Sequence, residues 1–237
     1  MALDLRRIEA VFLDVGNTLV GMDFEILCDL LAKEGVGVLP TALARAEAAA
    51  RPALSRFLER ASTEWLDTFT FYLRSVLDAL GGEAALERDR VAPRLAAELR
   101  RTVPTQRLWS SILPGVPDTL AALHASGRTL VAVSNSDGTV EAGLEALGLR
   151  QFLHHVVDSA VVGVEKPDPA IFHHALGLAG RPPERTLHVG DLYAVDVVGA
   201  RGAGLHAVLL DPYGDWPELD CERVFDVPSV GRRLLEA

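Results

Sequence analysis

The sequence predicts an α/β protein in which helices cover both faces of a mostly parallel sheet and an all-helical segment follows the first strand. Two observations predict this class. Short apolar runs alternate with segments of helical length near the start and over the second half of the chain, which is typical of parallel sheets. From about residue 22 to 105, stretches rich in alanine, leucine, arginine and glutamate instead show helical periodicity and hardly any strand signal.

The predicted strands are apolar runs that end at polar residues or glycine. The first run, VFLDV, ends at Gly16, Asn17 and Thr18, which indicates a buried strand followed by a tight loop. Later runs cover residues 129–134, 156–157, 186–190 and 205–210, and helical patterns cover residues 116–125, 139–147, 169–178 and 195–203. We therefore expect a Rossmann-like sheet.

The helical segment predicts a second domain. Its helical patterns, at residues 41–51, 64–80 and 90–101, are separated by glycine and proline breakers. We predict a Rossmann-like core from residues 1–20 and 106–237, with a helical cap domain at residues 21–105 that closes over the carboxyl end of the sheet. The aromatic residues of the cap are expected to pack in its core, and most of its arginines to be solvated. These residues are Trp65, Phe69, Phe71 and Tyr72, and Arg45, Arg51, Arg56, Arg60 and Arg74.

Composition narrows the classes of function. With 49% of its 237 residues apolar, the chain can bury a large core. A net charge of −10 repels a phosphate backbone, so we expect no nucleic-acid partner. The N-terminal sequence lacks a basic start followed by a long apolar run, so we predict a cytoplasmic protein with no membrane span. Cys28 and Cys221 predict neither a disulfide framework nor a thiolate metal site. No oligomeric state follows from the sequence.

Polar residues gather where the predicted strands end. They are Asp14, Ser134 with Asn135, Lys166 in the loop VEKP, and Gly190 with Asp191, followed by Asp196. Because open α/β sheets bind ligands beyond the carboxyl ends of their strands, these side chains are expected to form one site.

In this order the clusters resemble the four motifs of the haloacid dehalogenase-like hydrolase superfamily. DVGNTL is similar to the first motif, VSNSD to the second, EKPDP to the third and GDLYAVDVVGARGAGL to the fourth. The resemblance covers residues 8–19 and about 110–212. The helical insert is similar in position to the type 1 cap of subfamily I.

The resemblance implies a hydrolase that forms a covalent aspartyl intermediate. Asp14 would be the nucleophile. A carboxylate that attacks an anionic phosphoryl group needs a cation to offset the repulsion, and the resemblance implies Mg²⁺ held by Asp14, Asp191 and the backbone carbonyl of Gly16. Asp196 would support this site without binding the metal, and Thr18 would close the loop beside it.

The resemblance also implies how the substrate is bound. Ser134 and the backbone N–H of Asn135 would hydrogen-bond the transferring group, while Lys166 would add positive charge against the nucleophile and the developing oxyanion. The expected partner is a small phosphorylated molecule. His188 lies inside a predicted strand, so we expect a hydrogen-bonded core histidine there.

The chain departs from the family pattern at Gly16. Phosphatases of this superfamily usually carry a second aspartate there, which protonates the leaving alcohol and then activates water. Loss of such a group typically lowers rates by about a hundredfold to ten-thousandfold. The glycine is compatible with a phosphatase whose leaving group needs little protonation or whose acid comes from elsewhere. Asp23 and Glu25 are the nearest carboxyls after the motif.

Gly16 is also compatible with a metal-independent 2-haloacid dehalogenase, a carbon–phosphorus hydrolase or a non-catalytic binding or regulatory protein. Asp191 favours the metal-dependent branch over the dehalogenases. The carbon–phosphorus hydrolases of this superfamily form a Schiff base with a lysine of the cap. Lys33 is the only lysine of the predicted cap, and we expect it to be a solvated residue at a helix end instead.

Overall fold

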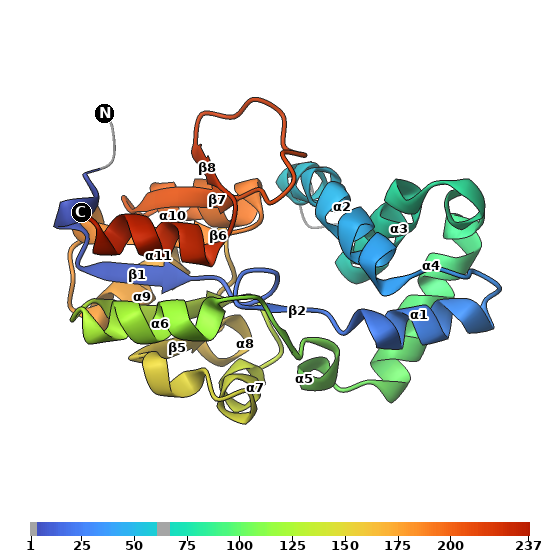
Figure 1. Cartoon of the computed structure of the whole chain (residues 1–237), viewed down its shortest axis with the longest axis horizontal. Helices are drawn as coiled ribbons and strands as arrows, with labels where there is room; N and C mark the ends of the chain where they lie inside the picture. The colour runs from blue at the N-terminus through green and yellow to red at the C-terminus, as the bar shows by residue number, and fades with distance from the viewer. Residues whose placement is uncertain (1–3, 61–66) are drawn as a thin grey trace.

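A six-stranded parallel sheet forms the centre of the larger domain of the molecule (Figure 1). The computed structural model describes residues 4–60 and 67–237. The strand order is β5-β4-β1-β6-β7-β8. After β1 the chain adds β4 and β5 on one side of it, and then crosses back to add β6, β7 and β8 on the other side. The strands are β1 (Ala10–Leu13), β4 (Thr129–Ser134), β5 (His155–Asp158), β6 (Thr186–Gly190), β7 (His206–Leu210) and β8 (Glu222–Val224).

Two apolar layers cover the sheet because alternate side chains of each strand point to opposite faces. Val11 and Leu13 of β1 pack on one face, and Ala10 and Phe12 pack on the other. The first face is covered by α6 (Val116–Ala125), α7 (Val140–Ala146) and α11 (Val227–Leu235), and the second by α9 (Pro169–Ala179) and α10 (Val198–Gly202). β1 is therefore buried from both sides.

Helices α1 to α4 form a second unit with a core of its own (Figure 1). They are α1 (Phe24–Lys33), α2 (Pro40–Arg60), α3 (Thr68–Leu80) and α4 (Gly82–Thr102). As expected, Tyr72 is buried in this core, with Phe69 and Phe71 packed against it. Trp65 lies outside the described residues. This helical domain after the first strand confirms the predicted fold class, while its expected limits at residues 21 and 105 stay a prediction.

Short elements join the two units. The ribbon of β2 (Val20–Gly21) and β3 (Ser111–Ile112) is antiparallel and lies where the chain leaves and re-enters the sheet domain. The other short elements are η1 (Leu5–Arg7), α5 (Thr105–Leu108), η2 (Arg150–Phe152), α8 (Ser159–Val162), η3 (Pro183–Arg185) and the π-helix η4 (Tyr193–Val197).

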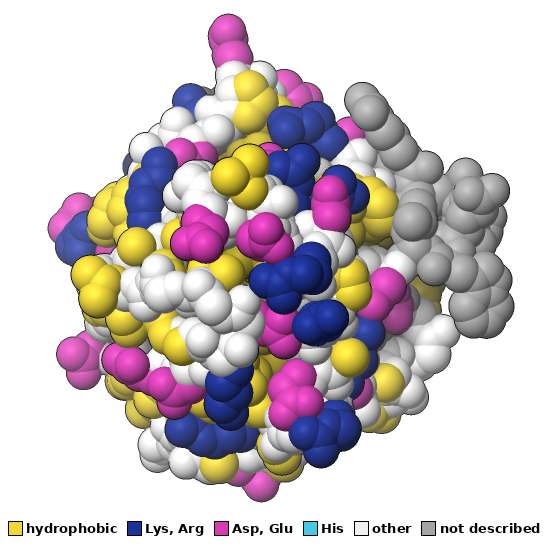
Figure 2. All heavy atoms as spheres, turned by 90° about the vertical axis from the view of Figure 1, so that its right-hand side faces the viewer, with side chains coloured by type: hydrophobic (Ala, Val, Ile, Leu, Met, Phe, Trp, Pro, Cys, Tyr) yellow, Lys and Arg dark blue, Asp and Glu magenta, His cyan; other side chains and the backbone are white. Residues whose placement is uncertain are grey.

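The outer end of the helical domain carries acidic and basic side chains intermixed (Figure 2). Ion pairs such as Arg88 with Asp78 and Arg90 with Glu34 lie on these helices. None of the helices in the described part of the chain is long and apolar enough to cross a membrane.

Candidate active site

Asp14 lies at the carboxyl end of β1, near the centre of the sheet. Its backbone N–H donates to the carbonyl oxygen of Val189 in β6 at 2.9 Å, and the residue is 8% exposed. Ser134 ends the neighbouring strand β4 at the same edge and is buried as well. Because the strand order reverses on either side of β1, Asp14 occupies the position where such sheets bind ligands.

The ammonium group of Lys166 lies between two carboxylates. Its Nζ donates to Oδ1 of Asp14 at 2.6 Å and to Oδ1 of Asp196 at 2.8 Å. The side-chain amide of Asn135 fixes the backbone of Lys166 by donating to its carbonyl oxygen and accepting from its N–H, both at 2.8 Å. Burial alone would lower the pKa of Lys166, but the two carboxylates outweigh it and raise the pKa, so Lys166 stays charged.

Asp196 is a buried part of this network rather than a helix-surface residue. Its Oδ1 accepts from Lys166 and from Nε2 of His188 at 3.0 Å, and its Oδ2 accepts from the N–H of Leu192 at 3.0 Å. His188 is the hydrogen-bonded core histidine that the sequence predicts, and burial lowers its pKa. Gly190 makes room for this arrangement, because a Cβ there would lie 2.2 Å from Cγ of Asp196.

Asp14, Asp191 and Asp196 form a compact group of buried carboxylates. One oxygen of each lies within 4.8 Å of the others. Burial raises the pKa of Asp14 and of Asp191. Burial acts in the same direction at Asp196, but Lys166 and His188 outweigh it and lower the pKa.

These carboxylates fit the expected Mg²⁺, which prefers hard oxygen ligands and relieves the repulsion between buried acids. The oxygens of Asp196 already accept three hydrogen bonds. Asp14 and Asp191 therefore have more lone pairs to offer an ion.

The loop after β1 carries Gly16 in the place of the usual second aspartate. A Cβ on Gly16 would lie 3.3 Å from the indole ring of Trp109, so the indole covers this position. Trp109 packs against the cores of both the sheet and the helical domain. Asn17 has a φ of 53°, a left-handed conformation that asparagine tolerates. Thr18 is fully buried, and its hydroxyl has no hydrogen-bond partner among the described residues.

Two charged residues of α2 reach the site from the helical domain. Arg51 is 8% exposed, and its Nε lies 3.3 Å from Oδ2 of Asp191. Its Nε and Nη2 donate to the carboxylate of Glu47, the closest contact being 2.6 Å. Glu47 also accepts from the hydroxyl of Tyr72 at 2.8 Å and from Nδ2 of Asn17 at 2.9 Å.

Arg51 is one of the cap arginines that were expected to be mostly solvated, and the structure buries it instead. Glu47 was not named from the sequence. Their spacing of four residues is a helical ion-pair signal, but exposed pairs have the same spacing. Only the packing of α2 on the sheet domain distinguishes this pair from solvated arginines such as Arg56, which is exposed.

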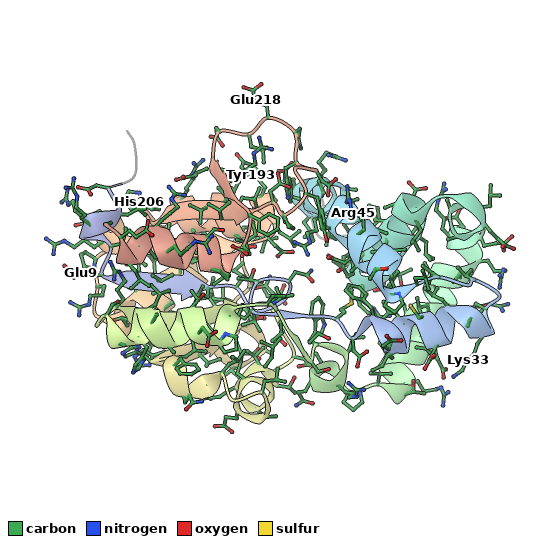
Figure 3. The ribbon with its side chains drawn as sticks, viewed as in Figure 1. Glu9, Lys33, Arg45, Tyr193, His206 and Glu218 are labelled. Atoms are coloured by element: carbon green, nitrogen blue, oxygen red, sulfur yellow. The ribbon has the colours of Figure 1, made fainter. Side chains whose placement is uncertain are left out.

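The other charged candidates lie elsewhere. Asp23 caps α1 through the N–H of Glu25 at 3.1 Å and pairs with Arg107 at 2.5 Å. Glu25 itself is exposed. Lys33 is exposed at the end of α1, on the side of the helical domain far from the sheet (Figure 3). The expectation of a solvated lysine at this position is confirmed.

A family model for haloacid dehalogenase-like hydrolases matches residues 8–204. Haloacid dehalogenase-like hydrolase domain-containing protein 3 of Homo sapiens is 38% identical over 148 residues, which are 62% of this chain and 55% of that protein. The phosphoserine phosphatase of Thermus thermophilus is 34% identical over 169 residues, 70% of this chain and 67% of that protein. The chain spans about half the length of the curated relatives it matches first.

Two further comparisons concern a shorter match to a phosphatase and a solved structure. A glyceraldehyde 3-phosphate phosphatase of Methanothermobacter thermautotrophicus is 37% identical over 99 residues, 41% of this chain and 44% of that protein. Among solved structures, the putative HAD-hydrolase YfnB of Bacillus subtilis, bound to magnesium, has a TM-score of 0.65 at 19% identity. That comparison covers 96% of this chain and 99% of the other and shows a shared fold.

Proposed function

Because this chain belongs to the haloacid dehalogenase-like hydrolases, we propose that it is a magnesium-dependent phosphatase that acts on a small phosphorylated molecule through an aspartyl-phosphate on Asp14. The buried group of Asp14, Asp191 and Asp196, with oxygens within 4.8 Å of one another, carries this proposal. Attack on an uncharged carbon centre needs no cation, whereas attack on a phosphoryl group does. The names of two relatives, phosphoserine phosphatase and glyceraldehyde 3-phosphate phosphatase, support phosphoryl chemistry.

Each residue has a defined part in this reaction. Lys166 holds Oδ1 of Asp14, which leaves Oδ2 to attack phosphorus. Asp196 keeps Lys166 oriented by accepting a second N–H from its ammonium group. Mg²⁺ held by Asp14, Asp191 and the carbonyl of Gly16 would supply the charge that offsets repulsion between nucleophile and substrate. Ser134 and the N–H of Asn135, at the end of β4, would hold the phosphoryl oxygens.

The test is release of phosphate from 4-nitrophenyl phosphate with Mg²⁺ and with a chelator. We expect turnover that needs the metal and is lost in Asp14→Asn, which keeps the shape of the side chain but not the nucleophile. Asp118→Asn is the matched control, because Asp118 is exposed on α6. The folded content of both variants is compared by circular dichroism.

Three results would contradict the proposal. Release of chloride from L-2-chloropropionate without metal would identify a dehalogenase. Silence toward both substrates, or turnover that survives Asp14→Asn, would favour a binding or regulatory protein or another nucleophile.

A further inference from the structure

We propose that the substrate's leaving group departs as an unprotonated anion that Arg51 stabilises, so that the substrate is an acyl phosphate or a phosphoanhydride. This inference rests on the proposed phosphatase function and specifies its substrate class. The leaving group of such a compound is a carboxylate or a phosphate, which needs no proton in order to depart.

The side of the site opposite the nucleophile lacks an acid at the position where the family has one. In-line attack by Asp14 from the sheet edge places the leaving oxygen toward the helical domain. On that side Gly16 has no side chain, and the indole of Trp109 lies 3.3 Å from where its Cβ would be. An apolar ring therefore fills the space beside Gly16. It leaves little room for a water molecule or an acidic group of the substrate to act as a proton donor there.

The titratable groups that reach the site from the helical domain offer no proton to the leaving oxygen. Glu47 accepts hydrogen bonds from Asn17, Arg51 and Tyr72 and acts as an acceptor. Tyr72 donates its hydroxyl proton to Glu47, and burial raises its pKa well above the usual value. Lys166 donates to Asp14 and Asp196, so its ammonium group lies beside the nucleophile, opposite the leaving oxygen. Among residues 4–60 and 67–237, these groups leave the leaving oxygen without a proton donor.

Arg51 provides positive charge in place of a proton. Glu47 holds its Nε and Nη2, which fixes the guanidinium beside Asp191, and no described residue accepts a hydrogen bond from its Nη1. A guanidinium stays protonated in proteins, so Arg51 carries a positive charge at this place. An arginine that is charged, buried and oriented in advance suits a carboxylate or phosphate leaving group.

The proposed reaction balances without an acid. Asp14 forms a bond to phosphorus, the bond from phosphorus to the leaving oxygen breaks, and the electron pair stays on the departing carboxylate or phosphate. Water then attacks phosphorus, the bond to Asp14 breaks, and the carboxylate of Asp14 is restored. One proton of the water remains on the phosphate product, and the other passes to a second phosphate oxygen.

The first experiment compares leaving groups on the unmodified protein. We measure kcat/KM with Mg²⁺ for acetyl phosphate, pyrophosphate, a series of substituted phenyl phosphates and glycerol 1-phosphate. We expect acetyl phosphate to exceed glycerol 1-phosphate by about a hundredfold to ten-thousandfold, the range that a missing general acid leaves uncompensated. The phenyl phosphates should show a steep fall in rate as the leaving phenol becomes less acidic.

The outcomes separate the two proposals. If glycerol 1-phosphate reacts within about tenfold of acetyl phosphate, a proton donor is present, and the inference fails while the phosphatase remains. If no compound shows turnover that depends on Asp14, the proposed function fails and the inference falls with it.

The second experiment tests Arg51 with the Arg51→Met and Arg51→Lys variants. Arg51→Met should lower kcat/KM for acetyl phosphate by about a hundredfold to a thousandfold, as loss of an oxyanion donor does, and should steepen the dependence on the leaving phenol. Arg51→Lys keeps the charge but not the planar pair of donors, so it should lose less activity and steepen the slope to a smaller degree. Arg56→Met, at an exposed position of the same helix, is the matched control.

The slope distinguishes a chemical from a structural role, because a merely misfolded fraction lowers all rates equally. An unchanged slope in Arg51→Met or in Arg51→Lys, with native circular dichroism, would overturn the part assigned to Arg51. If Arg51→Met does not fold, Arg51→Lys decides.

Discussion

The indole of Trp109 packs closely against Gly16, which has no side chain. An aspartate at position 16 alone is therefore not expected to supply the missing acid. The side chain of Gly16→Asp would run into the indole, 3.3 Å beyond its Cβ, and such overpacking typically costs about 1–3 kcal/mol. Adding Trp109→Ala removes the conflict. We expect the double variant to hydrolyse glycerol 1-phosphate at least about tenfold faster than Gly16→Asp. Phosphate release and urea unfolding measure the two effects.

Trp109→Ala alone is the control for lost packing, because Trp109 contacts both cores. If Gly16→Asp kept full stability and gained the activity without the second change, the indole would not be what excludes an acid from this position.

The same glycine affects the second half of the reaction. Hydrolysis of the aspartyl-phosphate requires activation of a water molecule, and Gly16 offers no base for it. We expect this step to be slower than the first, so that the intermediate accumulates. Rapid mixing with 4-nitrophenyl phosphate should then show a burst of about one nitrophenol per active site, and acid quenching should trap the phosphorylated chain. A linear time course with no trapped phosphate would show that water is activated efficiently.

The residues that the sequence placed in the site were predictable because they follow strand ends. Asp14, Ser134 and Asp191 lie far apart in the sequence, yet the carboxyl ends of the parallel strands β1, β4 and β6 meet at one edge. Arg51 and Glu47 have no such signal, since a helix alone does not reveal which of its faces meets another domain. Their place in the site is decided by long-range packing, which a single sequence does not display.

Asp67 shows how one side chain can join two helices of the helical domain. It caps α3 by accepting from the N–H of Thr70 at 3.2 Å, and it binds Nη1 of Arg100 in α4 at 2.7 Å. The hydrogen bond from Arg100, more than any other interaction, lowers the pKa of Asp67. A lowered pKa means that this stabilisation is present above the unfolded pKa of about 4 and is lost as the pH falls toward the folded value.

Asp67→Asn keeps the cap but removes the charge. Because both partners are half-exposed, we expect the free energy of unfolding to fall by only about 0.2–1 kcal/mol at pH 7, with a smaller difference at pH 3 and in high salt. Urea unfolding of the unmodified protein and of the variant at the two pH values measures this. Asp67→Ala, which also removes the cap, should cost about 1 kcal/mol more. If Asp67→Asn lowers the stability by the same amount at both pH values, the effect comes from something other than charge.

At the scale of elements, the bounds of helices and strands were predictable where the apolar pattern is strong, and not where it is weak. The expected helix at residues 116–125 and the strands at 129–134 and 186–190 coincide with α6, β4 and β6. The helix expected at 195–203 begins earlier, as the π-helix η4, where Asp196 turns back to accept the N–H of Leu192. β8 is a three-residue edge strand with two charged residues, and so short a polar segment has no recognisable alternation.

At the scale of the whole molecule, α2 provides the contacts that hold the helical domain over the site. Besides Glu47 and Arg51, Ser55 accepts from the backbone N–H of Ala194 at 2.9 Å. Arg45 (Figure 3) binds Asp215, in the loop after β7, through both terminal nitrogens, at 2.6 and 2.8 Å. Arg51, which is proposed to contact the leaving group, is thus also one of the residues of α2 that join the two domains.

If the buried acids bind the proposed Mg²⁺, we expect the stability of the folded chain to depend on that ion. Without a cation, Asp191 is a buried carboxylate with a raised pKa beside Asp14 and Asp196, which is a cost to the folded state. An ion that binds only the folded protein stabilises it by about 2.7 kcal/mol at a hundred times its Kd, equivalent to a rise in Tm of roughly 5–10 °C. We expect this rise in thermal unfolding with Mg²⁺, and its reversal by chelator.

Asp191→Asn should separate the two effects. Arg51 keeps its pair with Glu47 in this variant, so removing the charge should raise Tm in chelator by relieving the repulsion among the acids. It should also abolish most of the response to Mg²⁺, because it removes a ligand. The two proteins should therefore exchange their order of stability when the metal is added. Asp118→Asn, on the surface of α6, should leave both values unchanged. If Asp191→Asn responds to Mg²⁺ as the unmodified protein does, the ion binds elsewhere, and the carboxylates at the end of β1 and β6 are held together by Lys166 and Arg51 alone.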